Sequence, residues 1–150
     1  MIQLKKILVP VDFSESSKLA FTYAASFSLE FGSEIHLLHV IEEETIHVGS
    51  LEDPRHMGEK WEKESLQKLG EFVDAPYKEL PVVLKAIGGE ISDTIFSYAQ
   101  ENNVDLIIMG ARGQSGFVES LLGSTSYDVA RKAPCPVLTV KPYDHPFISA

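Results

Sequence analysis

Short runs of consecutive apolar residues alternate along the chain with segments in which apolar residues recur every three or four positions. The runs lie at residues 7–11, 35–41, 80–87, 104–109 and 137–140. Apolar side chains at successive positions are typical of strands that are covered on both faces of a parallel sheet. The sequence therefore predicts five buried strands.

The segments between these runs predict four helices. The first follows Asp12 and Ser14 and ends before Gly32, a common C-terminal cap. The others are predicted at residues 55–74, 90–102 and 124–132. Strands that alternate with helices indicate an α/β fold, a doubly wound five-stranded parallel sheet with helices on both faces. Ligands of such sheets bind beyond the carboxyl ends of the strands.

Length and charge narrow the range of functions. The 150 residues fit one domain, which we expect to span residues 1–141, followed by a loose tail at 142–150. A net charge of −9 and a pI near 4.9 oppose binding to nucleic acids and anionic membranes. No run approaches the ~18 apolar residues of a membrane span, and the single cysteine cannot form an internal disulfide. We expect a cytoplasmic protein without nucleic-acid or membrane partners.

A glycine-spaced segment carries the most informative chemistry. Gly110 and Gly113 follow the fourth predicted strand, and after nine further residues Gly123-Ser124 begins the last helix. Glycines let backbone amides approach an anion closely, and a helix N-terminus adds N–H donors, so phosphate suits such a loop. Arg112 and Arg131 could add positive charge. The alternative is structural, with turn glycines and Ser124 as a helix cap.

The pattern Gly-x-x-Gly, nine residues, Gly-Ser resembles the nucleotide loop of the universal stress protein family. The likeness extends from residues 5–12 (KKILVPVD) to residues 134–140 (PCPVLTV). It implies a sheet in the order 3-2-1-4-5 and a homodimer joined through the last strand, Val137–Val140. It also implies bound ATP, accompanied by Mg²⁺ or Mn²⁺, in members that keep the glycine loop.

The resemblance also assigns positions in the site. Those expected around the adenosine are Pro10, Val11, Asp12, Val40 and Met109, and those expected to hold the phosphates are Gly110, Arg112, Gly113, Gly123, Ser124 and Thr125. Asp12 has an alternative interpretation, because Asp followed three residues later by Glu15 resembles a capping box at the start of a helix. The five histidines lack the spacing of a metal site, so no metal ligand is predicted within the chain.

Four functions fit these features to different degrees. We expect a nucleotide-dependent regulatory homodimer, acting on a protein partner that the sequence does not identify, rather than an enzyme. A slow ATPase or phosphotransferase is an alternative, with Asp12 as the one carboxylate to nominate. A phosphate-accepting receiver lacks its acidic pair and has Gly88 where the phosphorylated Asp belongs. A nucleotide-free docking dimer would make the glycine loop purely structural.

Overall fold

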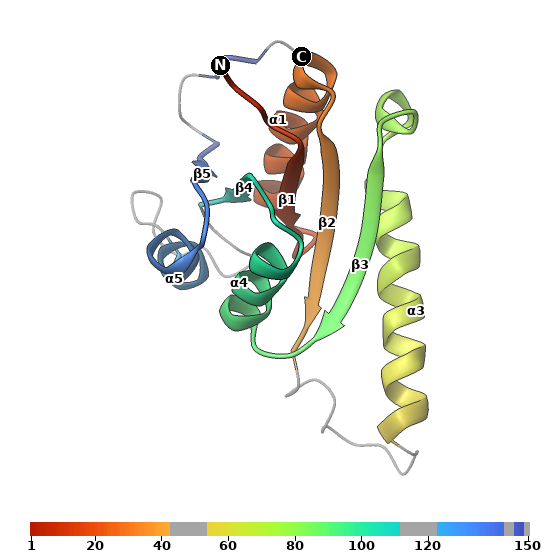
Figure 1. Cartoon of the computed structure of the whole chain (residues 1–150). Helices are drawn as coiled ribbons and strands as arrows, with labels where there is room; N and C mark the ends of the chain where they lie inside the picture. The colour runs from red at the N-terminus through yellow and green to blue at the C-terminus, as the bar shows by residue number, and fades with distance from the viewer. Residues whose placement is uncertain (43–53, 112–122, 143–145, 149–150) are drawn as a thin grey trace.

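The computed structural model describes residues 1–42, 54–111, 123–142 and 146–148. Its elements follow one another as β1 (Lys6–Pro10), α1 (Glu15–Phe31), β2 (Glu34–Ile41), α3 (Pro54–Phe72), a 3₁₀ turn (Ala75–Tyr77), β3 (Val82–Gly88), α4 (Ile91–Glu101), β4 (Leu106–Gly110), α5 (Ser124–Lys132) and β5 (Val137–Val140) (Figure 1). The predicted strands and helices are all present. The bounds of α5 and β5 agree with the prediction, and the other elements differ from it by a few residues at their ends.

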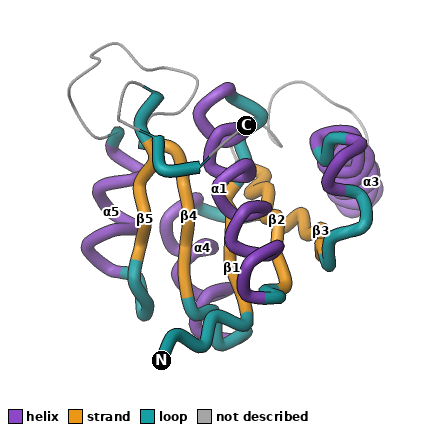
Figure 2. The backbone as a smooth tube through the Cα atoms, turned by 90° about the horizontal axis from the view of Figure 1, so that it is seen from above, coloured by secondary structure: helices purple, strands orange, loops and turns teal. Residues whose placement is uncertain are grey.

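All five strands form one parallel sheet in the order β3-β2-β1-β4-β5. Figure 2 shows this order from above, with β5 at one edge and β3 at the other. The chain moves outward from β1 to β3, and then returns to place β4 on the other side of β1. The ends of β1 and β4 therefore form the switch point at which doubly wound sheets bind their ligands.

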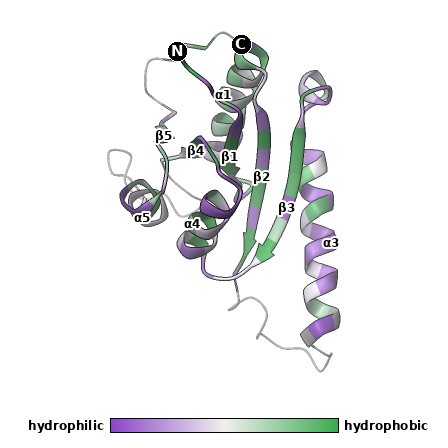
Figure 3. Cartoon of the chain, in the orientation of Figure 1, coloured by the Kyte–Doolittle hydropathy of each residue, from purple (hydrophilic) through white to green (hydrophobic). Residues whose placement is uncertain are grey.

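Helices cover the two faces of the sheet, and each face has its own core. Ile7 and Val9 of β1 pack with α1 and α3, whereas Leu8 between them packs with α4 on the opposite face. All three side chains are fully buried. Apolar residues on consecutive positions are thus explained by burial on both sides. Figure 3 shows mostly hydrophobic colour along β3, whereas α3 beside it carries both colours.

The start of α1 differs from the capping box proposed for Asp12. The helix begins at Glu15, and Ser14 is its N-cap, with a side-chain oxygen that accepts a hydrogen bond from the Ser17 amide at 3.2 Å. Asp12 lies outside the helix, where its carboxylate accepts from the Ser14 amide at 3.0 Å. The carboxylate therefore orders the turn that precedes the helix.

The second half of α1 ends at Gly32 and lies against the last described residues. Gly32 caps the helix with a left-handed φ of 72°, as predicted for that glycine. Residues 146–148 have no regular secondary structure, and the ring of Phe147 lies 5.1 Å from that of Tyr23 on α1.

Among the described helices, none combines the length and apolar character needed to cross a bilayer.

Candidate functional site

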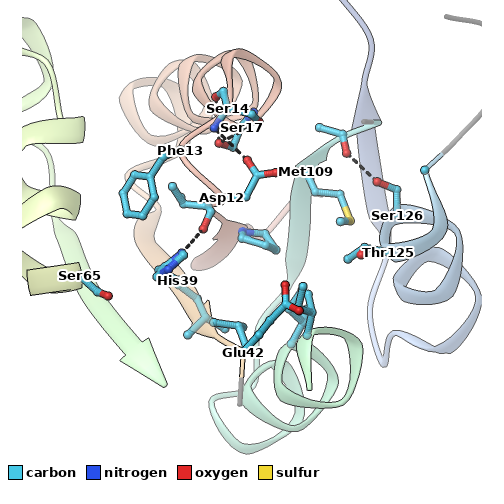
Figure 4. A pocket seen from close by; sticks show the side chains of 18 of the residues that line it. Asp12, Phe13, Ser14, Ser17, His39, Glu42, Ser65, Met109, Thr125 and Ser126 are labelled. Atoms are coloured by element: carbon cyan, nitrogen blue, oxygen red, sulfur yellow. Dashed lines mark hydrogen bonds between the residues drawn. The ribbon is translucent and has the colours of Figure 1, made fainter. Parts of the chain in front are cut away.

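A cleft of about 570 Å³ opens at the carboxyl ends of β1, β2 and β4. Its walls come from the starts of α1, α4 and α5 and from the middle of α3, so four helices contribute to it (Figure 4). The residues that the sequence predicted for a nucleotide and that line this cleft are Pro10, Val11, Asp12, Val40, Met109, Gly110, Gly123, Ser124 and Thr125. The other two, Arg112 and Gly113, lie outside the described residues. The cleft therefore brings together predicted positions that are far apart in the sequence.

The turn between β1 and α1 has an unusual backbone. Phe13 has a φ of 64°, a left-handed conformation that is costly for a bulky side chain. His39 of β2 fixes the turn from the other side, because its Nδ1 lies 2.7 Å from the Val11 carbonyl oxygen. A carbonyl can only accept, so Nδ1 carries the hydrogen and donates, and Nε2 is an acceptor in the neutral ring. The Phe13 and His39 rings lie 4.7 Å apart.

Gly110 has a packing role at the end of β4. A β-carbon added there would lie 2.0 Å from Ser16 Oγ and 2.9 Å from the Ser16 carbonyl carbon. Only a glycine lets the first turn of α1 approach β4 this closely. The Gly110 carbonyl also accepts a hydrogen bond from the Ser126 hydroxyl at 2.7 Å, which ties the start of α5 to β4.

The N-terminus of α5 opens into the cleft, and no side chain of the described residues caps it. Gly123 is the N-cap residue, and its own amide donates to the Ala111 carbonyl at 2.7 Å. Ser124 and Thr125 add hydroxyls at the first turn, where amide donors and the helix dipole favour an anion. Arg131, which the sequence offered as a phosphate partner, instead lies in the last turn of α5 with its guanidinium 5.8 Å from the Tyr127 ring.

Apolar side chains fill the middle of the cleft, and charges lie around it. Ile91 and Ile95 of α4 line the apolar part together with Val40 and Met109. The described charged residues that line the cleft are Asp12, Glu42 and Lys68. A flat apolar group fits the middle, with polar groups directed to the ends.

Several of these lining residues are absent from the sequence prediction. Phe13 and His39 are next in sequence to the predicted Asp12 and Val40, and this adjacency could have indicated them. Ser65 and Lys68 of α3 and Ile91 and Ile95 of α4 carry no local signal, because each is one polar or apolar position on an ordinary amphipathic helix.

The two histidines of β2, His36 and His39, lie on opposite faces of the sheet and have different partners. His36 is buried on the α4 face, with Nδ1 2.6 Å from the Tyr98 hydroxyl and Nε2 2.5 Å from a Glu34 carboxylate oxygen. Burial, and then the Glu34 charge, raise the pKa of Tyr98 above the usual tyrosine value. His39 lies at the cleft instead. Among the described residues no cluster of three or more His, Cys, Asp or Glu could hold a metal ion.

Comparison with known proteins places this architecture in a family. The sequence model of the Universal stress protein family matches residues 3–141. The chain belongs to the universal stress protein family. Universal stress protein MJ0577 of Methanocaldococcus jannaschii is 31% identical in sequence, over 93% of this chain and 96% of the relative.

Solved structures agree on the fold. The MJ0577 structure has a TM-score of 0.80 at 32% identity and covers 96% of this chain and 100% of its own. A universal stress protein in complex with cAMP has a TM-score of 0.66 at 21% identity, with 93% of this chain and 98% of that one covered. One from Archaeoglobus fulgidus in complex with dAMP has a TM-score of 0.63 at 22% identity, with 94% and 100% covered. At these lower identities the likeness shows the α/β fold alone.

Proposed function

We propose that this universal stress protein binds ATP in the cleft and acts as a nucleotide-dependent regulatory homodimer in the cytoplasm. The observation that carries the proposal is the N-terminus of α5, which has no side-chain cap among the described residues and faces the apolar middle of a cleft at the switch point of the sheet. Two fold neighbours are complexes with adenine nucleotides, which supports the same class of ligand.

The proposed arrangement divides the nucleotide between two environments. The adenosine lies against Pro10, Val11, Val40 and Met109, where apolar surface covers a base. The phosphates lie at α5, where Gly123 leaves the amides accessible and Ser124 and Thr125 offer hydroxyls. Arg112 and Gly113 remain predictions for the same phosphates.

The charges of the cleft favour an accompanying cation. Asp12 and Glu42 line the described cleft against the single positive charge of Lys68, so a polyphosphate without a metal would meet net repulsion. Oxygen ligands are those that Mg²⁺ and Mn²⁺ prefer, and the hydroxyls of Ser124 and Thr125 lie at the end of the cleft proposed for the phosphates. The bound ion would neutralise phosphate charge.

A regulatory role is proposed in place of an enzymatic one. Hydrolysis needs a group that orients water at the terminal phosphate. The Asp12 carboxylate is already engaged by the Ser14 amide at the start of α1, across the cleft from α5. We therefore assign Asp12 to ligand binding. The nucleotide-binding domain is proposed to span residues 1–141, followed by the tail at 142–150.

The proposed homodimer uses the exposed edge of the sheet. β5 is the last strand in the sheet order, so one side of Val137–Val140 has no neighbouring strand in the described chain. An unpaired edge is a template for pairing with a second copy. Association through β5 would leave the cleft of each subunit accessible, and the partner protein would be controlled through the liganded dimer.

Calorimetric titration with Mg-ATP tests the site through a charge placed at the helix cap. Gly123 has extended backbone angles (φ −62°, ψ 158°) that any residue adopts, and Asp is a better N-cap than Gly. Gly123→Asp should therefore keep α5 folded while it places a carboxylate where the phosphates bind. We expect affinity at least tenfold below that of Gly123→Asn, which has the same shape and no charge.

The control for net charge is Gln100→Glu, near the end of α4 and away from the cleft, which should bind like wild type. Equal affinities for Gly123→Asp and Gly123→Asn would remove α5 as the phosphate site. Absence of saturable binding by the wild-type protein would favour the nucleotide-free docking dimer.

A further inference from the structure

We propose that the α3 wall of the cleft is a second phosphoryl-binding subsite, so that the site accepts nucleotides with phosphoryl groups on both the 5′ and the 3′ oxygens of the ribose. This inference rests on the proposed nucleotide function and extends it. The groups that carry it are Phe13, His39, Ser65 and Lys68, which line the cleft on the side away from α5.

Ser65 is a largely buried residue whose hydroxyl lines the cleft. The residue is 8% exposed, and Figure 4 shows its side chain on α3, across the cleft from Thr125 and Ser126. In the part of the chain that the structure describes, this hydroxyl makes no hydrogen bond. The oxygen is not among the buried atoms that lack a partner in the described chain, so it is accessible from the cleft and available to a ligand oxygen.

Lys68 lies one helical turn after Ser65 and lines the same cleft. The ion pairs formed among the described residues do not include it. Its ammonium lies 5.9 Å from the centroid of the Phe13 ring, which holds the charge at the cleft wall. An ammonium beside a hydroxyl is a common pair of donors for phosphate oxygens.

His39 and Phe13 complete the subsite from the sheet side. Because Nδ1 of His39 donates to the Val11 carbonyl, Nε2 is the ring atom left for a ligand. It accepts from a protonated phosphate oxygen, or donates when the imidazole is charged. The left-handed backbone of Phe13 places its ring between His39 and Phe72, so the subsite has a rigid apolar floor.

The layout of the cleft indicates the ligand. Donors gather at α5 and at α3, and apolar residues from β1, β2, β4 and α4 lie between them. A nucleoside in the middle, with its ribose between a 5′ phosphoryl group toward α5 and a 3′ phosphoryl group toward α3, matches this order. Asp12 and Glu42 also line the cleft, so the second phosphoryl group must be held by direct contact with Lys68 and Ser65 rather than by a general positive field.

Two ligands with the same composition of phosphates separate this subsite from simple nucleotide binding. ADP carries both phosphoryl groups on the 5′ oxygen, whereas adenosine 3′,5′-bisphosphate carries one on the 5′ oxygen and one on the 3′ oxygen. We expect the full-length protein to bind the bisphosphate about tenfold more tightly than 5′-AMP in calorimetry. Lys68→Gln and Ser65→Ala should abolish that gain and change the affinity for ADP less than twofold. Lys63→Gln, which removes the same charge from an exposed position of α3, should behave as wild type.

The dinucleotide pApA identifies the source of the second phosphoryl group. If pApA shows the gain in affinity over 5′-AMP and the bisphosphate does not, and if Lys68→Gln abolishes this gain, the subsite is supported and its ligand group is a phosphodiester. The subsite is refuted if 5′-AMP, the bisphosphate and pApA bind with equal affinity, or if the gain in affinity persists in Lys68→Gln. In either case, binding of ADP and ATP would leave the proposed function standing. If no nucleotide binds, both proposals fall.

Discussion

Replacing Gly110 with alanine tests why β4 ends in a glycine. The added β-carbon would lie 2.0 Å from Ser16 Oγ, 2.7 Å from Ser16 Cβ and 2.9 Å from the Ser16 carbonyl carbon. Carbon atoms pack at about 3.5–4.0 Å, so a rotamer change at Ser16 cannot relieve the clash with the backbone. The start of α1 must move away from the sheet. Overpacking of this kind typically costs about 1–3 kcal/mol, and the backbone contact places Gly110→Ala at the upper end.

Urea and thermal unfolding measure this cost. The fluorescence of Trp61, the one tryptophan in the sequence, reports the transition. For a domain of this size, a loss near the upper end of that range corresponds to a fall in melting temperature of roughly 6–12 °C. The urea midpoint should fall while the slope of free energy against urea stays constant, because the unfolded chain is the same.

A double-mutant cycle identifies the cause of the loss. Ser16→Gly removes the two closest atoms, so the Gly110→Ala/Ser16→Gly pair should recover much of the stability, with a coupling energy above about 1 kcal/mol. Ser16→Ala removes only the hydroxyl and should recover less. Wild-type stability for Gly110→Ala would refute the packing argument. A loss without coupling to Ser16 would assign the effect to the glycine backbone itself.

Two further predictions concern contacts that hold the helices in place. Lys18 forms an ion pair with Asp74 at 2.9 Å and donates to a backbone carbonyl at the end of α3, so Lys18→Met should lower the unfolding free energy by about 1 kcal/mol in urea titrations. Tyr98→Phe leaves a buried nitrogen of His36 without its partner and should cost about 2 kcal/mol. Burial and Glu34 raise the pKa of Tyr98, so the folded protein keeps the hydroxyl proton at a pH at which the unfolded chain loses it. The free energy of unfolding should therefore fall as pH rises above about 10. This fall should be less steep in Tyr98→Phe, which has no hydroxyl to ionise.

Matched substitutions at exposed positions control for composition. Lys60→Met on α3 and Tyr127→Phe on α5 change the same groups at exposed sites and should shift stability by less than about 0.5 kcal/mol. A Tyr98→Phe variant with an unchanged alkaline slope would show that Tyr98 ionises alike in the folded and unfolded chains. Equal losses for Lys18→Met and Lys60→Met would remove the contact with α3 as the cause.

The fold could be predicted because its signals are local. Consecutive apolar runs mark strands that are buried on both faces, and Pro134 and Pro136 separate α5 from β5 so sharply that both were placed to the residue. The order of the strands came from family resemblance, since periodicity does not reveal which strands are neighbours. The cap of α1 was ambiguous because Asp12 and Ser14 are both good N-cap residues, and the choice between them depends on where the chain leaves β1.

The cleft residues that could be predicted are those that lie at the ends of strands or directly after them in the sequence. Pro10 and Met109 lie at the ends of apolar runs, at the edge where ligands of parallel sheets bind. Ser65 and Lys68 reach the same cleft because α3 packs beside β2. They are far in sequence from the residues of the other walls, so the sequence does not show that they belong to the cleft. A side chain that joins a site through packing of a whole helix gives no signal in its own neighbourhood.

The glycines of one sequence motif meet different physical needs, and this changes how the motif should be used as evidence. Gly110 is required by the approach of α1, so it would be needed in a member of this fold that bound no nucleotide at all. Gly123 has ordinary backbone angles that other residues tolerate, and a better helix cap would be available. A glycine at that position sacrifices capping energy and leaves the helix amides open. The choice at Gly123, rather than the whole pattern, is therefore the stronger indication that α5 binds an anion.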